Sequence, residues 1–317
     1  MTTVITGERG VDDLRAGPSI EAGAGAPPSH QPARRRRAGP IVLTATWAAA
    51  AASALAVWVL LHAVVLSGLQ ERGDQARAYA KLRQQLATGT APAGGPIAAG
   101  APVALLTARA AGWHHVVVVE GTRPGEVAKG PGHSPGTPLP GQAGTSVVMG
   151  RSFTHGAPFR HLRDLRAGDL LEVTTAQGTF SYRVEGRRAP GAPLPAPLPA
   201  GGARLTLVTS ANRGWSRAWV PDHVLYVDAA LQKGGAQPAA RQPAARPPAS
   251  SAPMSGDPSA LVGLVLWLQG LAAAAALVAW SSVRWGRTPA LLAGAPVLVA
   301  LLWAVTGAME LLLPNLY

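Results

Sequence analysis

Three stretches of the chain are apolar over at least the ~20 residues that a membrane helix needs. They run over residues 40–70, 258–283 and 288–313, and Glu310 is their only charged residue. The sequence therefore predicts three transmembrane helices, of which the last two form a hairpin because only residues 284–287 separate them. A cleaved signal peptide is the alternative for the first stretch, but its apolar core is too long and no clear cleavage site follows it.

Basic residues give these spans an orientation. Four arginines at 34–37 precede the first span, and Arg284 and Arg287 lie in the turn of the hairpin. Cytoplasmic flanks of membrane spans are enriched in Lys and Arg, and both basic clusters are cytoplasmic in a single arrangement. We therefore expect a multi-pass protein of the cell membrane with a cytoplasmic N-terminus and residues 71–257 outside.

The polar stretches between the spans differ in composition. Residues 1–39 are rich in Gly, Pro and Ala and predict a disordered cytoplasmic tail, and the Pro- and Ala-rich residues 232–257 predict an extended linker. Residues 71–96 predict a stalk that begins with an amphipathic helix. Its apolar positions are spaced by three and four residues: Ala76, Tyr79, Leu82 and Leu86. The folded domain is then confined to residues 97–231.

This domain shows the alternation of β-strands and no long helical pattern. One hairpin is predicted around residues 176–178, with Leu171 and Val173 before the turn and Phe180 and Tyr182 after it. Seven short strands are predicted, at 103–107, 114–119, 146–149, 170–175, 179–184, 204–209 and 219–227. We expect a mainly β fold whose sheet closes into a barrel, because closure removes exposed strand edges.

Composition narrows the function further. The chain is 48% apolar and only 14% charged, as expected for a membrane protein, and it has no cysteine. Disulfides, thiolate metal sites and cysteine nucleophiles are thereby excluded. The net charge of +12 comes from juxtamembrane and scattered arginines without interleaved aromatic residues, so nucleic-acid binding is not expected. The dispersed histidines have no acidic companion at ligand spacing, so we expect no metal and no cofactor.

The order of motifs in the domain resembles the sortases, cell-envelope cysteine transpeptidases of Gram-positive bacteria with an eight-stranded β-barrel. The stretch GTRPGEVAKGPGHSPGTPLPGQAG at 121–144 is similar to their Gly- and Pro-rich loop, and TSVVMGRSFTHGAPFRHLRDL at 145–165 to their Gly-His-Arg turn and Gly-Ala-Pro-Phe segment. The Gly-Asp at 168–169 and GTFSYRV at 178–184 follow in the same order. LTLVTS at 205–210 resembles the strand that ends in the catalytic cysteine, and residues 217–220 the strand that carries the arginine.

The resemblance places its catalytic positions on three residues. Ser210 stands at the cysteine position, Arg151 at the histidine position and Arg217 at the arginine position, so only the arginine is retained. An alcohol needs a base to become a nucleophile, and a guanidinium cannot supply one. His155 is a possible alternative base for Ser210, against its simpler interpretation as a turn residue. The two arginines form either a cationic cleft or a pair of solvated surface groups.

Three functions remain open on this basis. The first is a catalytically degenerate sortase that binds a cell-envelope peptide, polymer or partner protein at the membrane. The second is a divergent sortase-family hydrolase or transpeptidase that uses Ser210 as its nucleophile. The third is an external cap of a membrane complex, in which the transmembrane helices carry the function and the barrel covers the complex from outside.

Overall fold

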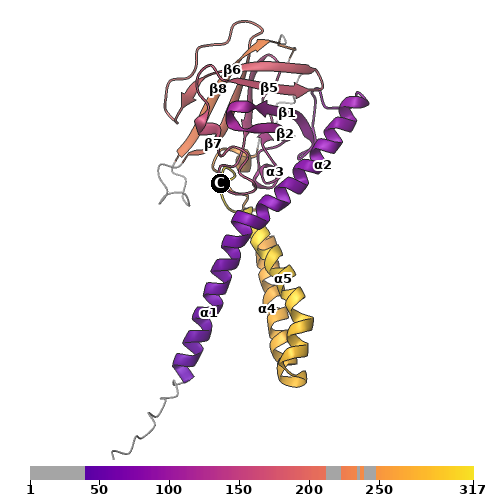
Figure 1. The fold of residues 1–317 in the computed structure, drawn as a ribbon, viewed down its shortest axis with the longest axis vertical. Helices are drawn as coiled ribbons and strands as arrows, with labels where there is room; N and C mark the ends of the chain where they lie inside the picture. Colours follow the sequence, from indigo (N-terminus) through magenta and orange to yellow (C-terminus); the bar gives the residue numbers. More distant parts are fainter. Residues whose placement is uncertain (1–39, 212–222, 234–235, 239–247) are drawn as a thin grey trace, which may run out of the picture. The chain divides into compact units, whose positions relative to one another are not determined.

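The computed structural model describes residues 40–211, 223–233, 236–238 and 248–317 (Figure 1). Contacts divide the chain into two units, Met1–Ala50 and Ala51–Tyr317, and the β-strands lie in the second. The predicted cytoplasmic tail and Arg217 lie outside the described residues. Helix α1 (Pro40–Leu61) passes through a short π-helix (His62–Leu66) into α2 (Ser67–Ala87) without leaving helical backbone angles.

A closed barrel of eight strands dominates the described chain, in the order β1-β2-β3-β4-β7-β8-β6-β5 (Figure 1). The strands are β1 (Pro102–Ala108), β2 (Trp113–Glu120), β3 (Gly132–His133), β4 (Gly144–Met149), β5 (Leu170–Thr175), β6 (Gly178–Arg188), β7 (Ala203–Ala211) and β8 (His223–Lys233). The pairs β2–β3 and β4–β7 are parallel and the others antiparallel. The predicted mainly β fold and closed eight-stranded barrel are confirmed. The two-residue strand β3 lies in a segment that the sequence predicts as loop.

The predicted hairpin is formed by β5 and β6. Val173 pairs with Phe180 and Leu171 with Tyr182, and all four side chains are buried. They join one continuous core inside the barrel, which includes the adjacent Phe159 and Leu162. The alternation of apolar residues along both strands thus sends one face of the hairpin into the core, as their period of two requires.

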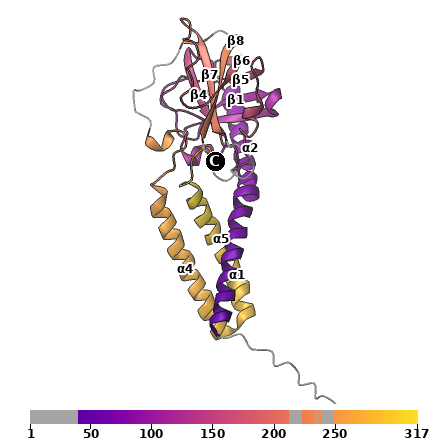
Figure 2. The ribbon, with the colours of Figure 1, turned by 90° about the vertical axis from the view of Figure 1, so that its left-hand side faces the viewer.

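Helix α2 begins close to the predicted stalk, but it packs on the barrel (Figure 2). Leu82 is only 1% exposed. The amide side chain of Gln75 accepts a hydrogen bond from the backbone N–H of Val117 at 2.8 Å and donates to the Val117 carbonyl at 3.1 Å. An amide that pairs with both backbone groups of one residue acts like an additional strand contact. The apolar face of α2 therefore covers β1 and β2.

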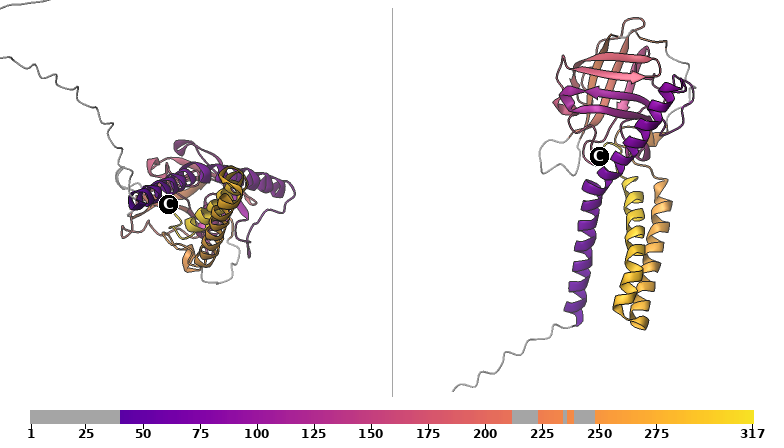
Figure 3. Two further views of the ribbon diagram at one scale, coloured as in Figure 1. Left: turned by 90° about the horizontal axis from the view of Figure 1, so that it is seen from below. Right: turned by 45° about the vertical axis from the view of Figure 1, so that its right-hand side comes forward.

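The C-terminal hairpin consists of α4 (Ala260–Trp285) and α5 (Arg287–Glu310), which run side by side (Figure 3). Gly294 lets the two helices approach, because a Cβ at that position would come within 2.2 Å of the Val278 side chain. Large apolar side chains of both helices, among them Leu266 and Leu292, face outward. A surface of this kind is suited to lipid.

Two helices in the described residues are long and apolar enough to cross a membrane, Ala260–Trp285 and Arg287–Leu312. In the part of the first predicted span whose side chains are described, the apolar helix Ala52–Leu61 is shorter than a membrane crossing. The predicted hairpin of two spans matches this pair of helices closely. The predicted count of three spans is not confirmed.

The predicted extended linker is wrong for its last ten residues. Residues 248–257 include a short 3-10 turn, Ala249–Ser251, and Ser251 is 4% exposed. The hydroxyl of Thr122 donates to the Ser251 carbonyl at 2.8 Å, and Arg123 forms an ion pair with Asp257. Proline and alanine content alone does not reveal such contacts, because they are made by the backbone and by one charged side chain.

Glu71 gives this fold a pH dependence. Its side chain is 8% exposed against Gly156, and burial raises the pKa of Glu71 from 4.5 to about 7, although nearby Arg72 opposes the shift. The folded state then holds a proton that the unfolded chain releases, so the free energy of unfolding falls as the pH rises from 4.5 to about 7. We expect Glu71→Gln to be more stable than the unchanged chain at pH 8, by about 1–3 kcal/mol, and equally stable at pH 4.5.

Thermal unfolding in detergent at both pH values measures this difference. Glu172→Gln, on the exposed face of β5, is the control and should match the unchanged chain at each pH. Equal stability of Glu71→Gln and the unchanged chain at pH 8 contradicts a buried, protonated Glu71.

Candidate functional site

The parallel pairing of β4 with β7 creates the candidate site. Met149, the last residue of β4, pairs with Val208, so the residues after Met149 and the last residues of β7 lie at the same edge of the barrel. The N–H of Gly150 donates to the Val208 carbonyl at 2.9 Å, and the Thr209 hydroxyl donates to the Gly150 carbonyl at 2.8 Å. These bonds fix the two backbones against each other. Residues 151–152 and Ser210 are thereby brought together although more than fifty positions separate them.

Ser210 lies at the end of this edge and is 4% exposed. Its hydroxyl donates to the carbonyl oxygen of Leu316 at 2.8 Å, and its Oγ lies 2.5 Å from the Oγ of Ser152. The N–H of Ser152 donates to the same Leu316 carbonyl at 3.1 Å. The site thus presents a backbone N–H and a pair of serine hydroxyls to one carbonyl, and neither serine is a base at neutral pH.

Arg151 points away from solvent and is 1% exposed. Its guanidinium donates to the Thr154 hydroxyl at 3.0 Å and to the Pro124 carbonyl at 3.1 Å. Burial lowers the pKa of Arg151 to about 10, which leaves it protonated at neutral pH and unable to accept a proton. The interpretation of Arg151 as a solvated surface residue is wrong, because its backbone position between Gly150 and Ser152 turns the side chain into the domain.

His155, the possible alternative base, is buried and has a positive φ of 52°. Its Nε2 is 3.2 Å from an oxygen of Glu310, and the other Glu310 oxygen is 2.9 Å from Nδ1 of His62. Burial lowers the pKa of His155, more than the hydrogen bond to Glu310 raises it. The ring of His155 is therefore oriented by a carboxylate at the end of α5, and its hydrogen bond is to Glu310.

His161, in the same loop as His155, is exposed, and its Nδ1 is 3.0 Å from a carboxylate oxygen of Asp164. No group of three His, Asp or Glu side chains in the described ranges is placed to hold a metal ion. Arg217 lies in residues 212–222, outside the described chain.

Ser152, Leu316 and Glu310 contribute to the site but were not predicted from the sequence. Glu310 offered a signal, because it is the only acidic residue after Asp257 and closes an apolar run, where a charge is costly unless it is paired. Ser152 and Leu316 offered none. A serine in a turn and a leucine beyond an apolar helix are ordinary in both places.

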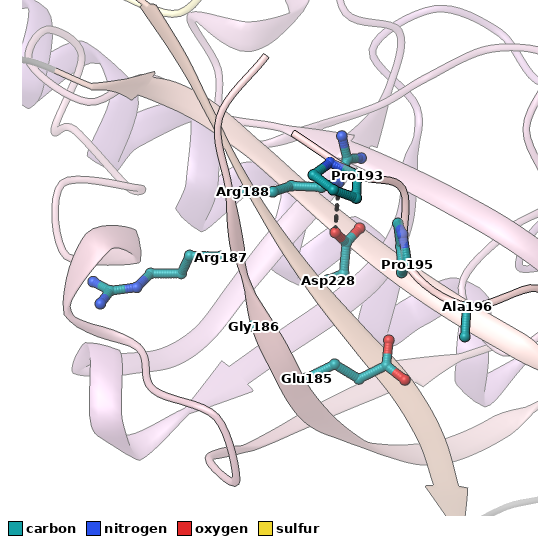
Figure 4. Close-up of a pocket in the computed structure, with 8 residues that line it drawn as sticks. All are labelled: Glu185, Gly186, Arg187, Arg188, Pro193, Pro195, Ala196 and Asp228. Atoms are coloured by element: carbon teal, nitrogen blue, oxygen red, sulfur yellow. Dashed lines mark hydrogen bonds and ion pairs between the residues drawn. The ribbon is translucent and has the colours of Figure 1, made fainter. Parts of the chain in front are cut away.

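A hollow of about 310 Å³ lies on the barrel away from these residues (Figure 4). Its charged groups are satisfied within the protein. Arg188 donates to Asp228 at 2.7 Å and stacks 4.2 Å from the Tyr226 ring, and Glu185 pairs with Arg204 at 3.2 Å. The paired charges in this hollow leave Ser210 and its neighbours as the stronger candidate site.

Part of the chain matches a known protein family. A model described as the sortase domain matches residues 106–215. A solved mutant of sortase E from Streptomyces avermitilis is 30% identical to the chain, covering 43% of this chain and 91% of that one with a TM-score of 0.35. Residues 106–215 are therefore a sortase domain. Arg151 and Ser210 lie within the matched residues of this sortase, and Arg217 lies beyond them.

This chain is also similar to further solved sortases. Sortase E from Streptomyces avermitilis is 29% identical, covering 43% of this chain and 91% of that one, with a TM-score of 0.36. A sortase D5 transpeptidase from Clostridium perfringens is 21% identical, covering 51% of this chain and 99% of that one, with a TM-score of 0.41. No curated protein matches the chain.

We expect the buried Arg151 to stabilise the folded state of this protein. Arg151→Met removes a buried cation, leaves the Pro124 carbonyl without that donor and takes a positive charge away from Glu310. We expect the free energy of unfolding to fall by about 2–4 kcal/mol, since breaking a buried charge network leaves its remaining members uncompensated. Denaturant unfolding in detergent measures this loss.

The matched control is Arg160→Met, which removes an exposed arginine from the same loop. Its effect should stay within about 0.5 kcal/mol. Equal stability of the Arg151 and Arg160 variants contradicts a structural role for Arg151.

Proposed function

We propose that this sortase-family chain binds a cell-envelope peptide, polymer or partner protein without cleaving it, and that it does so at the membrane. The sortase domain at residues 106–215 and the closed barrel support this proposal, and the two apolar helices after the barrel are long enough to anchor it. The absence of turnover and the binding role are the proposal.

One observation carries it. The hydroxyl of Ser210, at the position of the family's cysteine nucleophile, donates to the oxygen of a carbonyl group and lies 2.5 Å from a second serine. A hydroxyl nucleophile instead needs a base to remove its proton while it approaches the carbonyl carbon. Arg151, at the histidine position, is a buried cation bound to Thr154 and Pro124. The residues at the catalytic positions are thus suited to hold a carbonyl and not to attack it.

A second candidate is a hydrolase or transpeptidase that uses Ser210 with His155. One observation favours it: Glu310 orients the His155 imidazole at 3.2 Å, as a carboxylate orients the histidine of a catalytic triad. Burial also lowers the pKa of His155, which favours the neutral imidazole that a base requires. This candidate requires the imidazole to exchange its bond to Glu310 for one to Ser210, or to reach Ser210 with its other nitrogen.

Labelling with a fluorophosphonate probe decides between the two. We expect the purified full chain to remain unlabelled, and to leave a sorting-signal peptide uncleaved, because Ser210 has no base that activates it. Ser210→Ala is the matched control and should be equally silent. Labelling or cleavage that disappears in both Ser210→Ala and His155→Gln establishes the serine hydrolase instead.

The proposed orientation places the barrel outside the cell and residues 284–287 in the cytoplasm. Two contacts support a position of the barrel next to the start of α4 and the end of α5, on the same side of the membrane. Asp257, before α4, pairs with Arg123, and Glu310, at the end of α5, pairs with His155. Arg284 and Arg287 then lie at the opposite end of the hairpin, where the enrichment of cytoplasmic flanks in arginine favours them.

Single introduced cysteines test this orientation directly, because the chain has none of its own. In intact cells, a membrane-impermeant thiol reagent should label Leu194→Cys, which is 79% exposed on the barrel, and should not label Thr288→Cys, at the start of α5. Both should be labelled after the cells are opened. Labelling of Thr288→Cys alone in intact cells reverses the proposed orientation.

A further inference from the structure

The last described residues of the chain, around Leu316, contact the candidate site. Leu316 is 0% exposed and packs in a cluster of apolar side chains, the Leu316 site. The cluster draws on β4, β7, β8 and the segment before α4, and its members are Val147, Met149, Val208, Val224, Tyr226 and Met254. A leucine so completely enclosed occupies the site as an anchoring side chain of a bound peptide would.

Directed hydrogen bonds fix the backbone around Leu316. Its carbonyl receives the Ser210 hydroxyl at 2.8 Å and the Ser152 N–H at 3.1 Å. One residue on, the Thr154 hydroxyl donates to an oxygen of the Tyr317 backbone at 2.7 Å. The contacts to Leu316 and Tyr317 come from residues that the family resemblance assigns to the catalytic turn and strand.

Asn315 is held as firmly on the other side. It is 0% exposed, and its side-chain amide donates to the Thr122 carbonyl at 2.7 Å and to the Ala252 carbonyl at 3.0 Å. Its backbone N–H donates to the Ser255 carbonyl at 2.9 Å. Its Oδ1, however, is buried without a partner among the described residues. An unsatisfied acceptor weakens binding, so another peptide could fit this position better than the chain's own.

We propose that the chain closes the Leu316 site with its own residues 314–317, and that a separate peptide reaches the site only when this segment is released. This rests on the proposed binding function of the same site and adds its regulation. A ligand held on the same chain is present at an effective concentration of the order of millimolar, so a separate peptide binds well only when the segment is released.

The seated segment can be detected by thiol labelling, because the chain contains no cysteine. Leu316→Cys places a thiol at a 0% exposed position, and Leu313→Cys, the matched control, places one just before the segment at a position that is 36% exposed. In the full chain we expect Leu316→Cys to be labelled at least tenfold more slowly than Leu313→Cys. Equal rates mean that the segment does not occupy the site and overturn the proposal.

A binding measurement tests whether the site accepts a separate peptide. The probe is a dye-labelled peptide with the sequence of residues 313–317, and the opening variant is Leu316→Asp in the full chain, since a carboxylate is not tolerated in an apolar pocket. By fluorescence anisotropy, Leu316→Asp should bind the probe at least tenfold more tightly than the unchanged chain. Leu313→Asp should bind it as the unchanged chain does, and a probe with Asp in place of its second leucine should bind to none of them.

Each other result has a defined meaning. Equal affinity of Leu316→Asp and the unchanged chain, or no binding by a Leu316→Asp variant that unfolds at the same temperature as the unchanged chain, overturns this proposal. Neither bears on the absence of turnover, which the fluorophosphonate probe measures separately. A different result is cleavage of the probe by Leu316→Asp in a reaction that requires Ser210. That result agrees with closure of the site by residues 314–317, but it overturns the proposed binding without turnover.

Discussion

The arrangement of the site depends on one pair of parallel strands. Because β4 and β7 run in the same direction, the C-terminal ends of both strands lie at one edge of the barrel. There the Thr209 hydroxyl donates a hydrogen bond to the Gly150 carbonyl. Gly150 has no space for a side chain, since a Cβ would come within 2.5 Å of the Phe159 ring. Phe159 in turn donates its N–H to the Arg151 carbonyl at 3.0 Å. The turn after β4 is therefore fixed from both sides before any polar group of the site is considered.

From that fixed turn, successive residues point in opposite directions. Arg151 turns into the domain toward Thr154 and Pro124, whereas Ser152 turns toward Ser210. Residue identity then decides the chemistry. Three donor groups at Ser152 and Ser210 surround a carbonyl oxygen, and polarising a carbonyl is one half of acyl transfer. The other half, an activated nucleophile directed at carbon, finds no base among Arg151 and Ser152.

The sequence predicted what local patterns encode. The strands of β5 and β6 were predictable from the alternation of Leu171, Val173, Phe180 and Tyr182, and the order of motifs placed Arg151 and Ser210. Strand β3 was not predictable, because two residues carry no period and its pairing with β2 and β4 alone defines it. The face of α2 was predictable from Leu82 and its neighbours, but an amphipathic pattern does not say what it packs against.

The occupant of the site was beyond local patterns for a different reason. Residues 311–317 read as the end of an apolar helix, and the contact of Leu316 with Ser152 spans 164 positions. Proximity of this kind follows from the whole fold and not from the segment itself. The same limit applied to residues 248–257, whose composition resembles a linker although Ser251 and Asp257 are bound to Thr122 and Arg123.

The end of α5 connects the hairpin to this site through a very short length of chain. Glu310 accepts contacts from both His62 and His155, and an ionised carboxylate with two such partners is costly to separate from them in a poorly hydrated place. Only five residues lie between Glu310 and Leu316, and the Asp257 N–H holds the first of them by its carbonyl, at 2.8 Å. The position of α5 and the occupancy of the Leu316 site are consequently not independent, because one short backbone fixes both.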